Sequence, residues 1–370
     1  MVTAAPAPPL PAAVRNHPPR PSVRGLGPNW YATVMGTAIV ATAGAGLPVR
    51  VPGLSSVCRV VWGLSALMLC AVLAARAAHW ARHRDRARAD LLDPAVAPFH
   101  GCLPMALSAV GAATLSVGAQ VIGVRAAVAV DAALWAAGTL TALLTAAGIP
   151  ALMVVTHRIG PGDASPVWLL PVVAPMVSAA TGPALVPHLP PGQGREALLL
   201  GCVALAGASL LGTFLMLPLI FDRLVRHGPL PAALTPALFL VLGPLGQSTT
   251  AAGGLADAAA YTPGVPEAAV RFASVAYGVP VMGFALLWLA SAGALVVRTV
   301  RRGMPFAMTW WGFTFPVGTC VTGAAALARH TGLHALGWLA AGLYAALVAA
   351  WGLVAARTAL GLARGTLLAP

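Results

Sequence analysis

Hydroxyl and amide side chains recur inside the apolar stretches of this chain, close behind a proline. The four occurrences are Pro104-Met105-Ala106-Leu107-Ser108, Pro175-Met176-Val177-Ser178, Pro244-Leu245-Gly246-Gln247-Ser248 and Pro316-Val317-Gly318-Thr319. Such groups can donate hydrogen bonds to an anion and still release it. The leading candidates for the lining of a conduction path are Thr37, Ser108, Ser178, Gln247, Ser248 and Thr319. The same stretches also carry Thr42, Thr114, Thr181, Thr249 and Thr322.

No catalytic, metal or cofactor site is expected. His330 and His334 have the spacing of a metal pair on a helix, but Gly332 lies between them and no carboxylate or thiol joins them. The five cysteines are far apart and form no CxxC pair, so we interpret them as small buried apolar residues. We find no Walker motif and no Ser-His-Asp elbow. Asp131 and Glu267 are expected to be solvated near the ends of apolar stretches.

The proline motif defines an internal repeat. From Met35, which lacks the proline but begins Met-Gly-Thr, the equivalent positions are Met105, Met176, Leu245 and Val317, at intervals of 70, 71, 69 and 72 residues. A repeat of this length holds two membrane crossings, so we expect five helical hairpins in parallel orientation around one axis. Because proline bends a helix and frees carbonyl groups, the odd-numbered spans are predicted to line a central pore, with kinks at Pro104, Pro175, Pro244 and Pro316.

Composition places these elements in a membrane. Of the 370 residues, 59% are hydrophobic and only 8% are charged, which excludes both a soluble globular protein and a disordered chain. Ten stretches are long enough to cross a bilayer. They are 28–47, 54–78, 99–121, 126–153, 166–187, 196–221, 234–256, 267–297, 306–328 and 333–356. The expected fold is therefore an all-α polytopic membrane protein with ten transmembrane helices.

Arginine sets the expected orientation. If the N-terminal segment is cytoplasmic, 16 Arg lie in inner segments and 6 in outer ones, a clear positive-inside bias. We expect a multi-pass protein of the plasma (inner) membrane with both termini cytoplasmic. Residues 1–27 are predicted to be a disordered tail, 28–356 the transmembrane domain and 357–370 a short C-terminal tail. The net charge of +13 then reflects topology and the lipid bilayer, and no nucleic-acid partner is expected.

The chain resembles the tellurite-resistance/dicarboxylate transporter family, which includes slow-type plant anion channels and yeast malate and sulfite transporters. The matching segments are Pro28-Asn29-Trp30-Tyr31, Met35-Gly36-Thr37, Phe99-His100-Gly101, Pro104-Met105-Ala106, Gly243-Pro244-Leu245-Gly246-Gln247 and Trp310-Trp311-Gly312-Phe313-Thr314-Phe315-Pro316. The resemblance implies ten helices in five hairpins around a pore that a phenylalanine of the ninth helix plugs. The motif assigns this gate to Phe315, with Phe313 as the alternative. Relatives form trimers, so a homotrimer is expected.

The expected function is transport of small anions, most simply four-carbon dicarboxylates such as malate, or inorganic anions. The alternative is an efflux permease for sulfite or for toxic oxyanions such as tellurite. Because the predicted pore helices carry no charged residue in their middles, passive conduction or weak coupling is favoured over a proton-driven pump. A membrane-embedded enzyme is not expected, since no cluster of His or carboxylates lies at one interface. A non-conducting sensor is the remaining alternative.

Overall fold

The computed structural model describes residues 23–368, in which every regular element is helical. Five long helices are α2 (Leu54–Arg82), α6 (Val124–Val155), α8 (Gln193–His227), α10 (Glu267–Val300) and α12 (His334–Ala363). Five shorter ones alternate with them: α1 (Tyr31–Ala45), α4 (Cys102–Ala113), α7 (Leu169–Thr181), α9 (Leu242–Ala259) and α11 (Phe315–Thr331). Two small helices, α3 (Arg84–Leu92) and α5 (Ala119–Ile122), complete the set.

The two sets differ in burial. In the spans built on α4, α7, α9 and α11, 61–89% of the most apolar window is buried, against 17–28% for α2, α6, α8, α10 and α12. In α1, all residues except Thr42 and Ala45 are buried. A helix that is apolar on all sides and largely exposed is suited to lipid, whereas a buried one belongs to the protein interior. The short helices therefore form the inside of the molecule and the long helices its outside.

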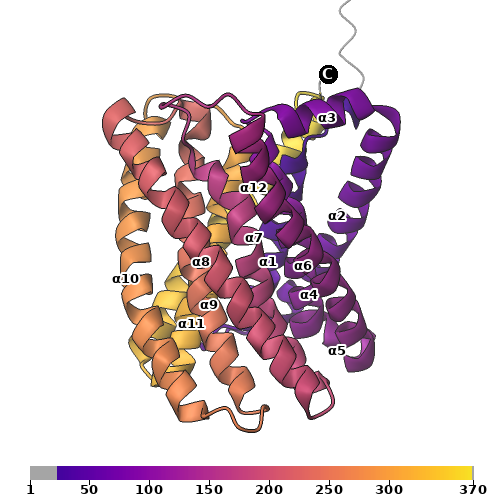
Figure 1. Cartoon of the computed structure of the whole chain (residues 1–370), viewed down its shortest axis with the longest axis vertical. Coiled ribbons are helices and arrows are strands. Elements are labelled where there is room, and N and C mark those ends of the chain that lie inside the picture. Colours follow the sequence, from indigo (N-terminus) through magenta and orange to yellow (C-terminus); the bar gives the residue numbers. More distant parts are fainter. Residues whose placement is uncertain (1–22, 369–370) are drawn as a thin grey trace, which may run out of the picture.

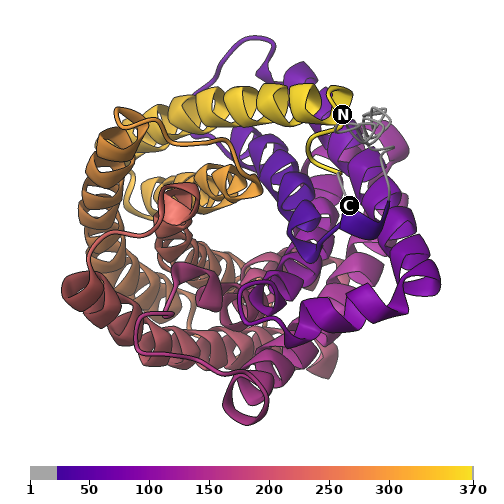
Figure 2. The ribbon, with the colours of Figure 1, turned by 90° about the horizontal axis from the view of Figure 1, so that it is seen from above.

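The inner helices pack in a closed cycle. Helix α1 contacts α4, α4 contacts α7, α7 contacts α9, α9 contacts α11, and α11 returns to α1. Each outer helix packs against the inner helix that precedes it in the chain and against the next inner helix of the cycle; α6, for example, contacts both α4 and α7. Seen from above, the outer helices surround the inner ones (Figure 2). The end of the molecule that carries the C-terminus and α3 is called the α3 end below, and the opposite end the distal end (Figure 1).

Nine helical spans of the described residues are long and apolar enough to cross a membrane. The stretch at 28–47, the first expected crossing, is not among them. Its α-helix has 15 residues and is preceded only by the 3-10 turn Pro28–Trp30. Fifteen residues rise about 22 Å, short of the roughly 30 Å hydrocarbon core. The helix ends before Gly46 and Pro48, where the chain turns.

Each inner α-helix is preceded by a 3-10 segment at the α3 end: Pro28–Trp30, Ala97–Gly101, Pro166–Trp168, Ala232–Val241 and Met308–Phe313. The predicted kink residues are found at or near these junctions. Pro104, Pro244 and Pro316 lie in the first turn of their α-helices, where the missing amide proton costs no helical hydrogen bond. Of these four predicted kink residues, Pro175 alone lies inside its α-helix. Three of the four predicted kink prolines thus mark where the 3-10 segment gives way to the α-helix.

Close helix contacts hold the inner ring together. A Cβ atom on Gly246 of α9 would lie 2.5 Å from the backbone nitrogen of Cys320 in α11, a separation that real Cβ atoms do not reach. At the α3 end, Asp90 of α3 lies 3.7 Å from Arg76 and 3.8 Å from His79, both in α2, and the acidic and basic side chains are about 5% exposed. Arg76 also donates a hydrogen bond of 2.6 Å to the carbonyl of Leu26.

The predicted domain boundaries can be compared with these elements. Residues 1–22 of the predicted tail lie outside the described residues. Residues 23–27, which the sequence placed in the tail, form the turn Val23–Gly25 and contact α2 through Leu26. At the other end, α12 continues past residue 356 to Ala363.

Candidate functional site

A cavity of about 450 Å³ lies between the inner helices and reaches from Phe315 toward the distal end. All five inner helices contribute to its wall, through residues such as Ile39, Ala109, Val177, Gln247 and Phe315. Its distal part is bordered by the π-helical stretch Thr114–Gly118, the start of α6 and the 3-10 segment Gly182–His188. The cavity therefore occupies the distal half of the space that the inner ring encloses.

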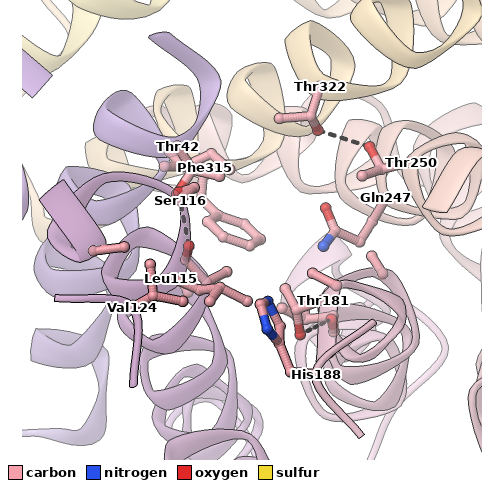
Figure 3. A pocket seen from close by; sticks show the side chains of 17 residues that line it. Thr42, Leu115, Ser116, Val124, Thr181, His188, Gln247, Thr250, Phe315 and Thr322 are labelled. Carbon is pink, nitrogen blue, oxygen red and sulfur yellow. Dashed lines mark hydrogen bonds between the residues drawn. The ribbon is translucent and has the colours of Figure 1, made fainter. Parts of the chain in front are cut away.

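The cavity wall is neutral and mostly apolar. Its polar side chains are five hydroxyls, one amide and one imidazole, from Thr42, Ser116, Thr181, Thr250, Thr322, Gln247 and His188. No charged side chain belongs to the wall. Figure 3 shows the amide of Gln247 and the imidazole of His188 on the same cavity as the ring of Phe315. An anion in this space would meet hydrogen-bonding groups and helix backbone, and no fixed positive charge.

The Phe315 side chain separates this cavity from a much tighter space. Toward the α3 end it borders a void of about 20 Å³, whose other walls include Met35, Met105, Val173 and Leu240. A second void of about 20 Å³ follows. Met35, Leu170 and Leu240 border both voids. Because each void holds about one water molecule, the interior of the ring is tightly packed between Phe315 and the α3 end.

Phe313, the alternative gate, has a different environment. Its ring makes an edge-to-face contact with Phe239 at a centroid distance of 4.9 Å and a second contact with Trp310 at 6.0 Å. It is not part of the wall of the cavity or of the two small voids. Phe313 therefore packs in the aromatic cluster of the 3-10 segment Met308–Phe313, where edge-to-face contacts are stabilising.

Of the six leading lining candidates, Gln247 lies on the cavity wall. The other five are buried and do not line it. Thr37 donates to the Thr33 carbonyl and accepts a hydrogen bond of 3.1 Å from Trp351 of α12. Ser108 lies against Gly138 of α6.

Ser178, Ser248 and Thr319 are also buried away from the cavity wall. The Ser178 carbonyl accepts a hydrogen bond from Trp135 of α6, and Ser248 donates to the carbonyl of Leu245. Thr319 donates to carbonyls of its own helix and of α9. A hydroxyl can satisfy itself on its own helix, so its presence does not reveal the face that meets a pore.

The wall contains residues that the sequence interpretation did not single out. Thr42, Thr181 and Thr322 were among the wider set of hydroxyls, but Ser116 and Thr250 were not. His188 was not among the lining candidates either, yet it lies on the wall beside Thr181 (Figure 3). A signal was available for Thr250, which lies three residues after Gln247 and so shares its helical face.

Asp131 also differs from expectation. It is 1% exposed, and neither carboxyl oxygen has a hydrogen-bond partner among the described residues. The residue lies on the face of α6 that packs against Gly111 of α4, where a Cβ atom would be 2.5 Å from its Oδ1. Solvation was expected because Asp131 is near the end of an apolar stretch, but tertiary packing covers it. Elsewhere, the described residues contain no group of three or more His, Cys, Asp or Glu side chains that could hold a metal ion.

Comparison with known proteins agrees with this architecture. The model of the voltage-dependent anion channel (SLAC1) family matches residues 25–359, and the chain belongs to this family. It is a membrane protein of a family of anion channels and transporters.

The chain is similar to three known proteins over most of its length. An uncharacterized transporter of Methanocaldococcus jannaschii is 24% identical over 337 residues, covering 91% of this chain and 93% of the relative. A sulfite efflux pump of Arthroderma otae is 25% identical over 316 residues, covering 84% of this chain and 83% of the pump. A sulfite efflux pump of Trichophyton rubrum matches to the same extent.

Proposed function

We propose that this protein moves small anions across a membrane through the centre of its inner ring, with Phe315 as the gate. The observation that carries the proposal is the neutral cavity of about 450 Å³ that all five inner helices line and that stops at Phe315. Membership of the anion channel family supports the ion class. A wall of weak hydrogen-bonding groups suits conduction, because an ion must bind well enough to enter and weakly enough to leave.

The proposed topology is ten crossings in five parallel hairpins, each made of an inner helix and the outer helix that follows it. The cycle of inner helices and the placement of each outer helix between two of them support this arrangement. Helix α1 would cross together with its flanking segments. The α3 end would be cytoplasmic, in the plasma membrane, because the Arg-rich segments are gathered there by the count of 16 inner against 6 outer. A homotrimer is proposed from the family resemblance.

For the substrate, the names of the relatives favour the efflux alternative. Two of them are sulfite efflux pumps, so we propose a small oxyanion of the sulfite type, leaving the cell, as the first candidate. Four-carbon dicarboxylates remain the second candidate, since the cavity volume exceeds what a sulfite-sized ion needs. Without a fixed cation on the wall, a singly charged ion is favoured over a dianion, which would lose more hydration free energy on entry.

The test is anion flux in proteoliposomes that contain the purified protein. Sulfite, chloride, nitrate and malate are offered singly to the wild type, Phe315→Ala and Phe313→Ala. Phe315→Ala should raise the flux of every permeant anion, because it joins the cavity to the void of about 20 Å³ on the α3 side of Phe315. Phe313→Ala serves as the matched control, because it removes an equal ring outside the path. Opening by Phe313→Ala instead would move the gate, and no flux of any anion through wild type or Phe315→Ala would refute the function.

A further inference from the structure

Gln247 has no hydrogen-bond partner, although it is 4% exposed. Its Oε1 atom is buried without a partner, and no described residue bonds to its amide nitrogen. Buried amides are normally satisfied, and an unsatisfied one costs free energy that needs an explanation. Gln247 lies on the cavity wall, and Figure 3 shows its amide projecting into the space beside the Phe315 ring. Since Oε1 is covered, the amide nitrogen is the atom available to a ligand, and it can only donate.

The hydroxyls of the same wall are not free donors. Thr42, Ser116 and Thr181 each donate to the carbonyl four residues earlier in their own helices, at 3.3, 2.7 and 3.0 Å. Thr250 and Thr322 lie 2.7 Å apart and each also lies 3.0 Å from a carbonyl, of Gly246 and Thr319 respectively. A hydroxyl has one hydrogen, so each of these groups offers the cavity only oxygen lone pairs.

His188 is the remaining polar residue of the wall. An imidazole ring always carries at least one N–H, and a second when it is protonated. No described residue forms a hydrogen bond with the His188 ring, which lies between Leu115 and Thr181 in Figure 3. The donors that the wall can offer to a ligand therefore come from Gln247 and His188, and its acceptors come from the five hydroxyls.

We propose that Gln247 and His188 form an anion-binding site in this cavity, and that its ligand is a small oxyanion that still carries a proton. The charged oxygens of such an ion accept from the amide and the imidazole, and its O–H donates to a hydroxyl lone pair on the wall. Hydrogen sulfite and the monoanion of a short dicarboxylic acid share this chemistry. Chloride and nitrate have no O–H, so they leave the hydroxyls unused. This inference rests on the proposed function and names the ligand of the same path.

The test measures flux selectivity in proteoliposomes at a pH where sulfite is largely the monoanion. The probes are hydrogen sulfite, hydrogen malate, chloride and nitrate. Gln247→Leu keeps the volume and removes the donor. It should lower hydrogen sulfite flux about tenfold or more, the effect of one hydrogen bond to a charged group, and should also lower chloride flux, because chloride accepts from the same amide. The preference for anions that carry a proton is read from the wild type, in which hydrogen sulfite or hydrogen malate should cross faster than chloride and nitrate. His188→Ala should act in the same direction, and His188→Gln, which keeps a donor, should restore part of the flux.

Thr249→Val is the matched control. Thr249 is two residues from Gln247 on α9, but its side chain meets Gly278 of α10 and Gly323 of α11. This variant should keep wild-type flux of each anion. A thermal melt of each purified variant checks that the fold is retained.

The possible failures are distinguishable. If wild type moves anions but Gln247→Leu lowers the flux of none of them, the binding site is refuted and the anion pathway stands. If wild type prefers chloride and nitrate over both hydrogen-bearing anions, the ligand class is refuted. If no anion crosses in any variant, including Phe315→Ala, the proposed function itself fails. Comparing hydrogen malate with hydrogen sulfite separates the two candidate ligands. The natural ligand should cross faster than the other at the same concentration.

Discussion

The Oγ1 atoms of Thr250 in α9 and Thr322 in α11 lie 2.7 Å apart on the cavity wall, one turn from Gln247. This pair joins two inner helices. Each hydroxyl also lies within hydrogen-bonding distance of a carbonyl of its own helix. The neighbouring amide of Gln247 takes no part in it. The polar groups of the cavity thus divide into hydroxyls that bond to helix backbone or to one another and donors that are left for a ligand.

The closed part of the path should require two changes to open fully. Phe315→Ala removes the first barrier, but Leu240 still borders both small voids beyond it. We expect the double variant Phe315→Ala/Leu240→Ala to conduct more than Phe315→Ala, and Leu240→Ala alone to remain near wild type. Single-channel or flux recordings of the three variants measure this. Equal conduction by the single and double Phe315 variants would show that no second barrier exists.

Gln247→Leu should stabilise the protein while impairing its anion flux. Replacing an unsatisfied buried amide by an apolar side chain of similar size removes a desolvation cost of about 1–3 kcal/mol. The expected result is a higher thermal midpoint of the purified protein in detergent without ligand. Thr249→Val, which removes a satisfied hydroxyl on the same helix, should not raise it. A lowered midpoint for Gln247→Leu would mean that the amide has a structural partner.

Gly246→Ala should destabilise the contact between α9 and α11. Its methyl group would lie 2.5 Å from the backbone nitrogen of Cys320, and backbone cannot rotate away. Overpacking of this kind costs about 1–3 kcal/mol. Gly243→Ala, one turn earlier, meets nothing within 4 Å and serves as the control, since it should be neutral or stabilising. Thermal midpoints compare the two, and similar values would contradict the close approach.

The buried ion pair Arg76–Asp90 should contribute more to thermal stability than the exposed pair Arg24–Asp85. Asp90→Asn leaves the charged Arg76 side chain, about 5% exposed, without its carboxylate partner. Breaking a buried ion pair in this way typically lowers the free energy of unfolding by about 3–5 kcal/mol, a large effect for a single substitution. Asp85, whose carboxylate lies 3.5 Å from Arg24 on the surface, provides the control, and Asp85→Asn should leave the midpoint unchanged. Denaturation of the reconstituted protein measures both. A small effect for Asp90→Asn would show that water reaches Arg76.

Asp131→Asn should raise the thermal midpoint. The carboxyl group of Asp131 is 1% exposed and unpartnered between α6 and α4, and an unsatisfied buried polar group costs roughly 1–3 kcal/mol, more when it is charged. Glu267→Gln, at the exposed start of α10, changes charge in the same way without burial and should have no effect. Loss of stability in Asp131→Asn would reveal a partner that requires the carboxylate.

Hydropathy was enough to predict an all-helical membrane protein, because it follows from local composition. The motif Trp310–Pro316 likewise predicted the family. The sequence did not predict that α1 is only 15 residues long, nor that a 3-10 segment precedes each inner helix. Local sequence does not report where a 3-10 segment ends.

Tertiary structure alone decided which face of each inner helix meets the cavity. Thr37 and Thr42 lie on one helix, yet Thr37 contacts Trp351 of α12 and Thr42 reaches the cavity. Ser178 and Thr181 differ in the same way on α7. Because all sides of these helices are apolar and small, no amphipathic pattern marks one face. The rotation of each helix is set by its close contacts with neighbours, such as Gly246 against Cys320, which only the folded chain brings together.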